Sequence, residues 1–288
     1  MTTTLPFRQI AILGTGLIGG SFALAVRKQL PSATIIGFDR SGPAASALAR
    51  GAIDKFAPDL ANAVQGADLI YIAMPIAATI ESLPQIAAAA EPHALITDAC
   101  STKTTVCKAA AEHFKNSARF LGGHPMAGKE HSGIENADAD LFQGAPYALI
   151  ATEADSDPRV EAFSNLLNAV GAQPIYTDPE THDWAVSIVS HLPQLAAIAL
   201  ARVVQGETDE TGLPLSLSGP GLQDTLRLAG SPYAIWRDIL LTNSANISRA
   251  LDRLSQAIDY LRTQLTSKEI QQEFDAANAL YQLLRKQK

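Results

Sequence analysis

The sequence predicts an α/β protein in which a doubly wound parallel sheet is followed by an all-helical domain. Short apolar runs alternate with alanine-rich helical segments through the first 177 residues, which is typical of a parallel sheet covered by helices on both faces. A glycine-rich turn joins the first run to the first helical segment. From Asp178 on, the apolar spacing is helical throughout. We therefore expect two domains, residues 1–177 and 178–288.

The composition excludes several classes of protein. The chain has 288 residues, of which 47% are hydrophobic and 18% charged, as in globular proteins with a sizeable core. Its 22 basic and 29 acidic residues give a net charge of −7, which argues against nucleic-acid binding. Cys100 and Cys107 are the two cysteines, too few for a disulfide framework or a metal site, and they indicate a reduced, cytoplasmic setting. We see no signal peptide, and the longest uncharged stretch, Trp184–Ala201, is too short and polar to span a membrane.

The glycine-rich turn follows the apolar run Gln9–Leu13 and leads into a helical segment. A strand, a G-x-G-x-x-G turn and a helix together indicate dinucleotide binding in a Rossmann-type fold. The first glycine makes the turn, the second lets a pyrophosphate approach the backbone, and the third lets helix and strand pack closely. An ordinary glycine turn in another α/β protein is the alternative. The cofactor-binding residues predicted here are Gly14, Gly16, Leu17, Ile18 and Gly19.

The next predicted strand, Thr34–Phe38, ends at Asp39, about 20 residues after the glycine turn, where a carboxylate usually meets the ribose 2′-hydroxyl. Because a carboxylate repels a 2′-phosphate, we predict NAD in preference to NADP. Arg40 is the next residue and weakens this preference, since an arginine accommodates a 2′-phosphate.

Further predicted strands end in polar or proline-containing loops. The strands are Leu69–Ala73, Ala94–Asp98 and Arg119–Leu121, with Tyr147–Ala151 and Gln173–Tyr176 closing the sheet. Parallel sheets bind ligands at the carboxyl ends of their strands. We therefore expect three loops to converge beside the cofactor, carrying Met74 and Pro75, Ser101, and His124. Ser101, Thr102 and Thr104 also suit helix capping, and Lys103 suits an exposed helix charge.

The stretch Gly122–Gly133 reads GGHPMAGKEHSG. Pro125 pushes His124 into an extended conformation at the end of a strand. The glycines let the backbone turn sharply, and Glu130 adds a polar group that can face a ligand. We interpret the stretch as an active-site loop in which His124 is the working group. A glycine-rich surface turn with an incidental histidine is the alternative.

The second half begins with a helix start at Asp178-Pro179-Glu180. The helix through Val204 is apolar nearly all round, so we expect it to be buried. Pro193 lies inside it and should kink it. Ser187 and His191 are four residues apart and share one face beside the kink. A satisfied core histidine is the alternative to a ligand contact at His191.

The remaining helices carry regular apolar stripes. A short helix carries Arg227, and the next carries Trp236. Such stripes bury against another helix, either within the chain or in a second subunit, so dimerisation stays open on pattern alone. The stripe positions are Ile247, Leu251, Leu254, Ile258, Leu261 and Leu265, then Ile270, Phe274, Ala277, Tyr281 and Leu284.

Together these residues resemble the prephenate/arogenate dehydrogenase family, the cyclohexadienyl dehydrogenases of tyrosine biosynthesis. The resemblance covers essentially the whole chain. A GTGLIGGS segment is shared with many dehydrogenases, whereas HPMAGKEHSG paired with SHLP is far more specific. The matching segments are GTGLIGGS at 14–21, DACSTK at 98–103, GGHPMAGKEHSG at 122–133 and SHLP at 190–193, with Arg227 and Trp236.

The resemblance implies a Rossmann-type NAD-binding domain followed by an all-α dimerisation domain, with the active site in the cleft between them. It implies NAD-dependent oxidative decarboxylation of prephenate to 4-hydroxyphenylpyruvate, of arogenate to tyrosine, or of both, by a cytoplasmic homodimer. His124 would be the catalytic base, with Ser101 hydrogen-bonded near His124 and the nicotinamide. The residues implied at the substrate are Ser187, His191, Arg227, Glu130 and Trp236, the last from the partner subunit.

Two residues depart from the family pattern. Cys100 stands where a small residue is common, which leaves the packing near the nicotinamide open. Gln194 replaces a common histidine after SHLP, which leaves the preference between prephenate and arogenate open.

Two rival functions have their own signatures. Another two-domain NAD(P) enzyme, of the β-hydroxyacid dehydrogenase type, would use a lysine on a helix of the second half, but the first lysine after Asp178 is Lys268. A non-catalytic NAD(P)-sensing regulator would bind NAD without turnover and would not need His124, Ser101 and His191 together.

We predict that Arg227→Ala raises KM for prephenate far more than it lowers kcat, because an arginine that holds a substrate carboxylate contributes mainly to binding. Steady-state kinetics with saturating NAD measures both constants. An unchanged KM would remove Arg227 from the substrate site.

Overall fold

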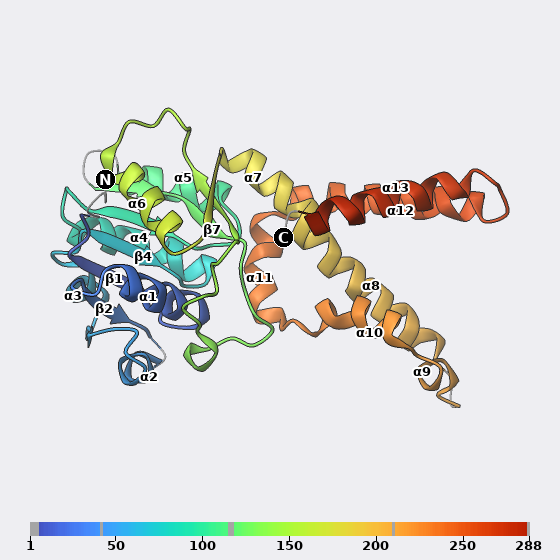
Figure 1. Cartoon of the computed structure of the whole chain (residues 1–288), viewed down its shortest axis with the longest axis horizontal. Helices are drawn as coiled ribbons and strands as arrows, with labels where there is room; N and C mark the ends of the chain where they lie inside the picture. Colours follow the sequence, from blue (N-terminus) through green and yellow to red (C-terminus); the bar gives the residue numbers. More distant parts are fainter. Residues whose placement is uncertain (1–5, 41–42, 115–117, 209–210, 287–288) are drawn as a thin grey trace. The chain divides into compact units, whose positions relative to one another are not determined.

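The computed structural model describes residues 6–40, 43–114, 118–208 and 211–286. The chain divides into two compact units. The first holds the residues up to Ala185 together with Ser231–Thr242, and the second holds Val186–Gly230 and the residues from Asn243 on (Figure 1). The division expected from the sequence falls after residue 177, so the first unit also takes residues 178–185 and Ser231–Thr242 from the C-terminal part.

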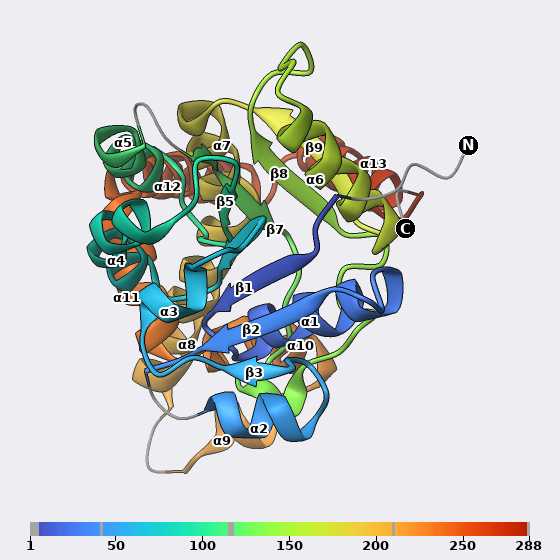
Figure 2. The ribbon, with the colours of Figure 1, turned by 90° about the vertical axis from the view of Figure 1, so that its left-hand side faces the viewer.

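The first unit is built on a six-stranded parallel sheet in the order β3-β2-β1-β4-β5-β6. Figure 2 shows β1, β2 and β3 side by side. The predicted parallel sheet is confirmed, with β1, β2 and β6 at the expected bounds. The strands are β1 (Gln9–Leu13), β2 (Thr34–Phe38), β3 (Lys55–Phe56), β4 (Leu69–Ile72), β5 (Leu95–Asp98) and β6 (Arg119–Leu121).

Helices cover both faces of this sheet. Successive residues of a strand point to opposite faces, so each strand contributes to two apolar clusters. Ile10 and Ile12 of β1 join one apolar cluster with α1 and α6. Ala11 and Leu13 join a second cluster with α3, α4 and α5. The helices of this unit are α1 (Leu17–Gln29), α2 (Pro43–Ala49), α3 (Leu60–Val64), α4 (Ile76–Ala89), α5 (Thr104–His113), α6 (Pro158–Ala169), α7 (Pro179–Val186) and α11 (Tyr233–Thr242).

A second, three-stranded sheet corrects the expectation that the later strands close the first one. It consists of β7 (Gly123–Pro125), β8 (Pro146–Ile150) and β9 (Gln173–Thr177), with β7 antiparallel to β8 and β8 parallel to β9. The chain crosses from β6 to β7 at Gly122 and Gly123. A Cβ at Gly122 would lie 2.7 Å from the Cys107 sulfur, and one at Gly123 would lie 2.6 Å from the Asp98 carbonyl oxygen. The crossing therefore requires glycine at both positions.

The second unit is helical, as expected. α8 packs against α10 and against the 3₁₀ turn η3, and α12 packs against α8 and the π-turn η2. Its elements are η2 (Ser187–His191), α8 (Leu192–Glu207), α9 (Leu213–Ser216), α10 (Pro220–Leu226), η3 (Arg227–Gly230), α12 (Ser244–Gln264) and α13 (Ile270–Lys286).

The helix predicted from Asp178 to Val204 is continuous from Pro179 to Glu207 and contains Pro193, as predicted. The irregularity beside the proline is the single π-turn η2, in which the Leu192 N–H donates to the Ser187 carbonyl five residues back. The prediction of burial all round is wrong, because Val189 is 66% exposed and Val203 59%.

Much of the apolar stripes of α12 and α13 is also exposed within the chain, although Ile247 is buried. Ile258 is 56% and Phe274 70% exposed, as are several of their stripe neighbours. Exposed apolar residues at helical spacing on α8, α12 and α13 indicate a surface that another protein chain can cover.

The helix Pro179–Glu207 is long and apolar enough to cross a membrane by length and composition alone. This is weak evidence for a membrane span, because helices of soluble proteins pass the same test.

Candidate active site

The glycine turn between β1 and α1 is tightly packed on one side and open on the other. Gly14 has φ +93°, and a Cβ there would lie 2.4 Å from the Ala73 carbonyl oxygen. A Cβ at Gly19 would lie 1.9 Å from the Gly14 carbonyl oxygen, whereas one at Gly16 would meet nothing within 4 Å. The turn thus has space at Gly16, where the dinucleotide pattern needs the pyrophosphate to approach the backbone. Leu17 and Ile18 begin α1 next to this space.

Asp39 lies beside this turn, directly after β2. Its Oδ2 accepts the Thr15 N–H at 2.9 Å, so the carboxylate is tied to the turn itself. The neighbouring Arg40 is exposed and lies 4.0 Å from the Glu81 carboxylate. A carboxylate in this place matches the group that binds a ribose hydroxyl in dinucleotide folds.

The carboxyl ends of β1, β4 and β5 lie side by side, since these strands are parallel neighbours. Met74 and Pro75 follow β4, and Pro75 is the N-cap residue of α4. Half-buried Ser101 follows β5. The sheet topology therefore brings the glycine turn after β1, Met74 and Pro75 after β4, and Ser101 after β5 to one edge.

Cys100 lies buried in the same loop. Its sulfur is 3.5 Å from the Thr79 hydroxyl and 3.9 Å from the Met74 carbonyl oxygen. Burial raises the pKa of the Cys100 thiol well above its ordinary value. Cys100, which departs from the family pattern, is therefore an uncharged side chain that contacts Thr79 of α4.

Lys103 corrects the expectation of an exposed helix charge, because its side chain is completely buried. Its ammonium forms an ion pair with Asp98 and donates to the Gly123 carbonyl oxygen at 2.6 Å. Burial alone would lower the pKa of Lys103, but the charge of Asp98 raises it above the ordinary value. Asp98 in turn accepts the Gly123 N–H at 3.1 Å. The pair thus binds both backbone polar groups of the residue before His124.

The N-terminus of α5 is capped by Asp183 of α7, which corrects the expectation that local serine or threonine side chains cap it. Asp183 Oδ1 accepts the Lys103 N–H at 2.7 Å, and Oδ2 accepts the Thr104 N–H at 2.9 Å. Thr102 is instead hydrogen-bonded to Thr242 of α11 at 2.7 Å. Burial alone would raise the pKa of Asp183, but hydrogen bonds from His182 and Thr104 lower it below its ordinary value.

His124 lies in the buried strand β7 and not in a loop, with 8% of its surface exposed. Its Nδ1 is 2.9 Å from His182 Nε2, and His182 Nδ1 is 2.8 Å from Asp183 Oδ1. The two rings meet edge to face, with an interplanar angle of 68°. Three titratable side chains from β7 and α7 therefore form one hydrogen-bonded row.

The other predicted substrate residues are distributed over both units. Ser187 and His191 are buried in the π-turn of the second unit, where His191 Nδ1 lies 3.3 Å from Asn243 Nδ2. Arg227 begins η3 of the same unit and is exposed. Glu130 is exposed in the first unit, in the segment after β7. Trp236 of α11, also in the first unit, donates its indole N–H to Ser231 at 2.9 Å.

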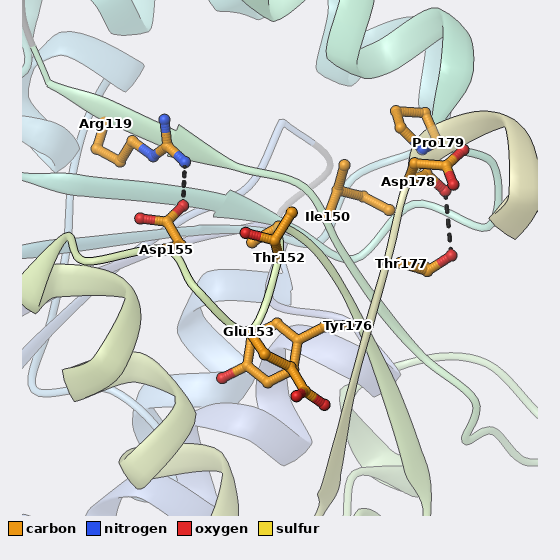
Figure 3. A pocket seen from close by; sticks show the side chains of 10 residues that line it. Arg119, Ile150, Thr152, Glu153, Asp155, Tyr176, Thr177, Asp178 and Pro179 are labelled. Carbon is orange, nitrogen blue, oxygen red and sulfur yellow. Dashed lines mark hydrogen bonds and ion pairs between the residues drawn. The ribbon is translucent and has the colours of Figure 1, made fainter.

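A cavity of about 600 Å³ lies elsewhere, and none of the predicted site residues line it. Figure 3 shows the Arg119–Asp155 ion pair at one side and Thr177 and Asp178 at the other. Arg119 begins β6, so the cavity adjoins the amino end of that strand, whereas the predicted cofactor site lies at the carboxyl ends. We therefore place the candidate active site around His124 and the glycine turn.

Comparison with known proteins assigns the chain to a family. The nucleotide-binding domain of prephenate dehydrogenase matches residues 22–176, and its dimerization domain matches residues 178–282. The chain is 36% identical to "Prephenate dehydrogenase" of Bacillus subtilis over 92% of its length and 72% of that protein. It is 30% identical to "Cyclohexadienyl dehydrogenase" of Zymomonas mobilis, over 91% of its length and 90% of that protein. This chain belongs to the prephenate dehydrogenase family.

Solved structures of the prephenate dehydrogenase family agree with this fold. Prephenate dehydrogenase from Aquifex aeolicus, solved with hydroxyphenyl propionate and NAD+, superposes with a TM-score of 0.87 at 26% identity, covering 98% of this chain and 99% of that one. Synechocystis arogenate dehydrogenase superposes with a TM-score of 0.80 at 28% identity, covering 95% and 99%. A 3-hydroxyisobutyrate dehydrogenase from Mycobacterium tuberculosis, 17% identical with a TM-score of 0.54, shares the fold alone.

Sequence reasoning missed four residues of this family member's candidate site: Asp98, Lys103, His182 and Asp183. Asp98 and Lys103 bracket the recognised DACSTK segment, but their spacing does not reveal burial. His182 and Asp183 follow the helix start at Pro179 and read as ordinary polar positions of a first turn. Their partners lie about 60 to 80 residues away in the chain, so only the folded structure reveals them.

We predict that Lys103→Met lowers the free energy of unfolding by about 3–5 kcal/mol, because it leaves the buried Asp98 carboxylate without its charge partner. Urea unfolding measures the change. Lys108→Met, an exposed position on the same helix, is the matched control and should change stability by less than about 0.5 kcal/mol. Equal effects of the two substitutions would show that the buried pair contributes nothing.

Proposed function

We propose that this protein is an NAD-dependent dehydrogenase that oxidatively decarboxylates prephenate, arogenate or both. The observation that carries the proposal is His124, held by a buried histidine and aspartate in a unit that also carries the dinucleotide turn. The curated family members support it, since their names state prephenate and cyclohexadienyl dehydrogenase activity. The arogenate dehydrogenase among the solved structures supports the second substrate.

In the proposed reaction, His124 accepts the proton of the ring hydroxyl while the carbon that bears it loses a hydride. NAD, when bound, accepts that hydride. The resulting ketone is linked through the ring double bonds to the carbon that carries the ring carboxylate. When carbon dioxide leaves, the electron pair of the broken C–C bond moves through the ring to the ketone oxygen, which takes the proton back from His124 as the ring becomes aromatic. The protein therefore has two chemical tasks, to orient the ring carbon and to polarise its hydroxyl.

We propose that the glycine turn, Asp39, Met74, Pro75 and Ser101 hold the cofactor. The fit is supported by the space beside Gly16 and by the Asp39 carboxylate tied to the Thr15 N–H. The negative charge of Asp39 favours the free 2′-hydroxyl of NAD over the 2′-phosphate of NADP. Arg40 lies toward Glu81, which reduces its availability for a 2′-phosphate.

For the substrate, we propose Ser187, His191 and Arg227, with Glu130 and Trp236 shaping the site. Burial of Ser187 and His191 in a π-turn supports this role, because such single π-turns occur frequently at functional sites. Arg227 supplies the cation that a dicarboxylate needs in a chain whose net charge is −7.

The activity is tested by incubating the protein with NAD and prephenate or arogenate and following nicotinamide reduction by absorbance, with NADP in parallel. We expect turnover with NAD, and we expect His124→Asn to lower kcat by about 10²–10⁴-fold with little change in NAD affinity. Turnover near the wild-type rate in His124→Asn would remove it as the base. NAD binding without turnover of either substrate would instead support a sensor.

We also propose that the protein is a cytoplasmic homodimer that assembles through its helical part. The exposed apolar positions of α12 and α13 support the dimer, as does the match to a dimerization domain. Cys100 and Cys107 are both free thiols, which is consistent with a reducing compartment.

Light scattering during gel filtration tests the dimer. We expect the wild type to elute at twice the chain mass of 30.5 kDa, and Ile258→Glu with Phe274→Glu to elute as a monomer, because burying two unpaired carboxylates in an apolar interface is costly. Ser255→Glu, an exposed polar position of α12, is the control and should remain dimeric. A monomeric wild type would contradict the proposal.

A further inference from the structure

We propose that His182, oriented by Asp183, is a positioning residue that holds His124 in the tautomer whose Nε2 accepts a proton. This inference rests on the proposed function, since it assigns His182 a part in the same reaction. His182 is 4% exposed and Asp183 1%, and both come from α7.

The direction of the hydrogen bonds starts at Asp183. An ionised carboxylate only accepts hydrogen bonds, and the pKa of Asp183 is held below its ordinary value by the hydrogen bonds from His182 and Thr104 despite burial. Its Oδ1 lies 2.8 Å from His182 Nδ1, so that nitrogen carries a hydrogen. The neutral ring then presents the lone pair of Nε2 on its other side.

The same reasoning continues to His124. His182 Nε2 lies 2.9 Å from His124 Nδ1. Because His182 Nε2 accepts, His124 Nδ1 must donate and carries the hydrogen. The lone pair of a neutral His124 is then on Nε2, the nitrogen that we propose accepts the proton of the substrate hydroxyl. With the opposite tautomer, His124 would present an N–H to that hydroxyl and would not accept its proton.

The hydrogen-bonded row of His124, His182 and Asp183 also stabilises the positive charge that forms on His124 during the reaction. When His124 takes the hydroxyl proton, the O–H bond breaks, an N–H bond forms at Nε2, and the ring becomes an imidazolium. Its Nδ1–H then donates to His182, which is in turn bound to the Asp183 carboxylate. The other charged groups packed nearby, Lys103 and Asp98, form an ion pair with each other. Asp183 therefore supplies the negative charge toward which the new positive charge is directed.

The backbone of Gly123, the residue before His124, is held as well. Lys103 and Asp98 bind the carbonyl oxygen and the N–H of Gly123, and Asp183 caps the helix that Lys103 precedes. The carboxylate that orients His182 thus also fixes the helix start that supports the strand of His124. The alternative is that His182 only packs in the core. The substitutions described next distinguish the two roles.

Two substitutions at His182 separate its two hydrogen bonds. In His182→Asn the side-chain amide nitrogen replaces Nδ1 and keeps the bond to Asp183, but no acceptor faces His124. In His182→Gln the amide oxygen takes the place of Nε2 and still accepts from His124 Nδ1. We expect His182→Asn to lower kcat by at least about tenfold, with KM and NAD affinity within about twofold, and His182→Gln to retain most of the wild-type kcat.

The pH profile of kcat/KM is the readout that a packing role would not change. In His182→Asn the imidazolium of His124 loses its acceptor, so the acidic limb of the profile should move to lower pH. In His182→Gln the limb should stay near that of the wild type. Equal losses of kcat in both variants, with the limb unmoved, would overturn the proposal.

Nitrogen-15 NMR of the imidazole rings in the wild-type protein tests the tautomer directly and does not depend on turnover. We expect His124 to show a protonated Nδ1 and an unprotonated Nε2. The opposite pattern would overturn the inference even if the enzyme is active. If the wild type turns over neither prephenate nor arogenate, the proposed function fails while the NMR result still decides the tautomer. The NMR result also decides if His182→Asn does not fold.

Discussion

The carboxylate of Asp183 joins three parts of the first unit that are distant in the sequence. It accepts the first N–H groups of α5, it binds His182 on its own helix, and through His182 it reaches His124 in the second sheet. A buried carboxylate is costly unless hydrogen bonds satisfy it. Because its partners include the backbone N–H groups of Lys103 and Thr104 and the His182 imidazole, the position of α7 is coupled to the start of α5 and to β7.

The buried pair of Asp98 and Lys103 gives the same region its rigidity. Asp98 ends β5, and Lys103 lies five residues later at the start of α5, so the pair closes the loop that carries Ser101. Its hydrogen bonds to Gly123 attach that loop to the strand of His124. The loop of the expected cofactor site and the strand of the expected base are therefore one hydrogen-bonded body. The His124 ring is hydrogen-bonded at Nδ1 and follows a residue whose backbone is fixed, so it retains little freedom to turn, as orientation of a general base requires.

The helical second unit differs from the first in where its polar and apolar side chains lie. Its polar residues of interest, Ser187 and His191, lie in a π-turn that widens the helix where Pro193 follows in the next turn. Many of its large apolar residues, in contrast, are exposed on α8, α12 and α13. A chain with that many exposed aliphatic and aromatic side chains gains free energy when a further surface covers them. This accounts for apolar stripes that have regular helical spacing and remain exposed in the single chain.

The local sequence determined the parallel sheet, the glycine turn, the acidic end of β2 and the helical second half, because short-range spacing and turn chemistry decide such features. The GGHPMAGKEHSG segment around His124 also indicated the protein family. Tertiary structure alone decided that Lys103 is buried against Asp98, that β7, β8 and β9 form their own sheet, and that α5 is capped by Asp183. Each of these depends on which distant segment supplies a hydrogen bond or a charge, and residue spacing holds no information about partners 58 to 80 positions away.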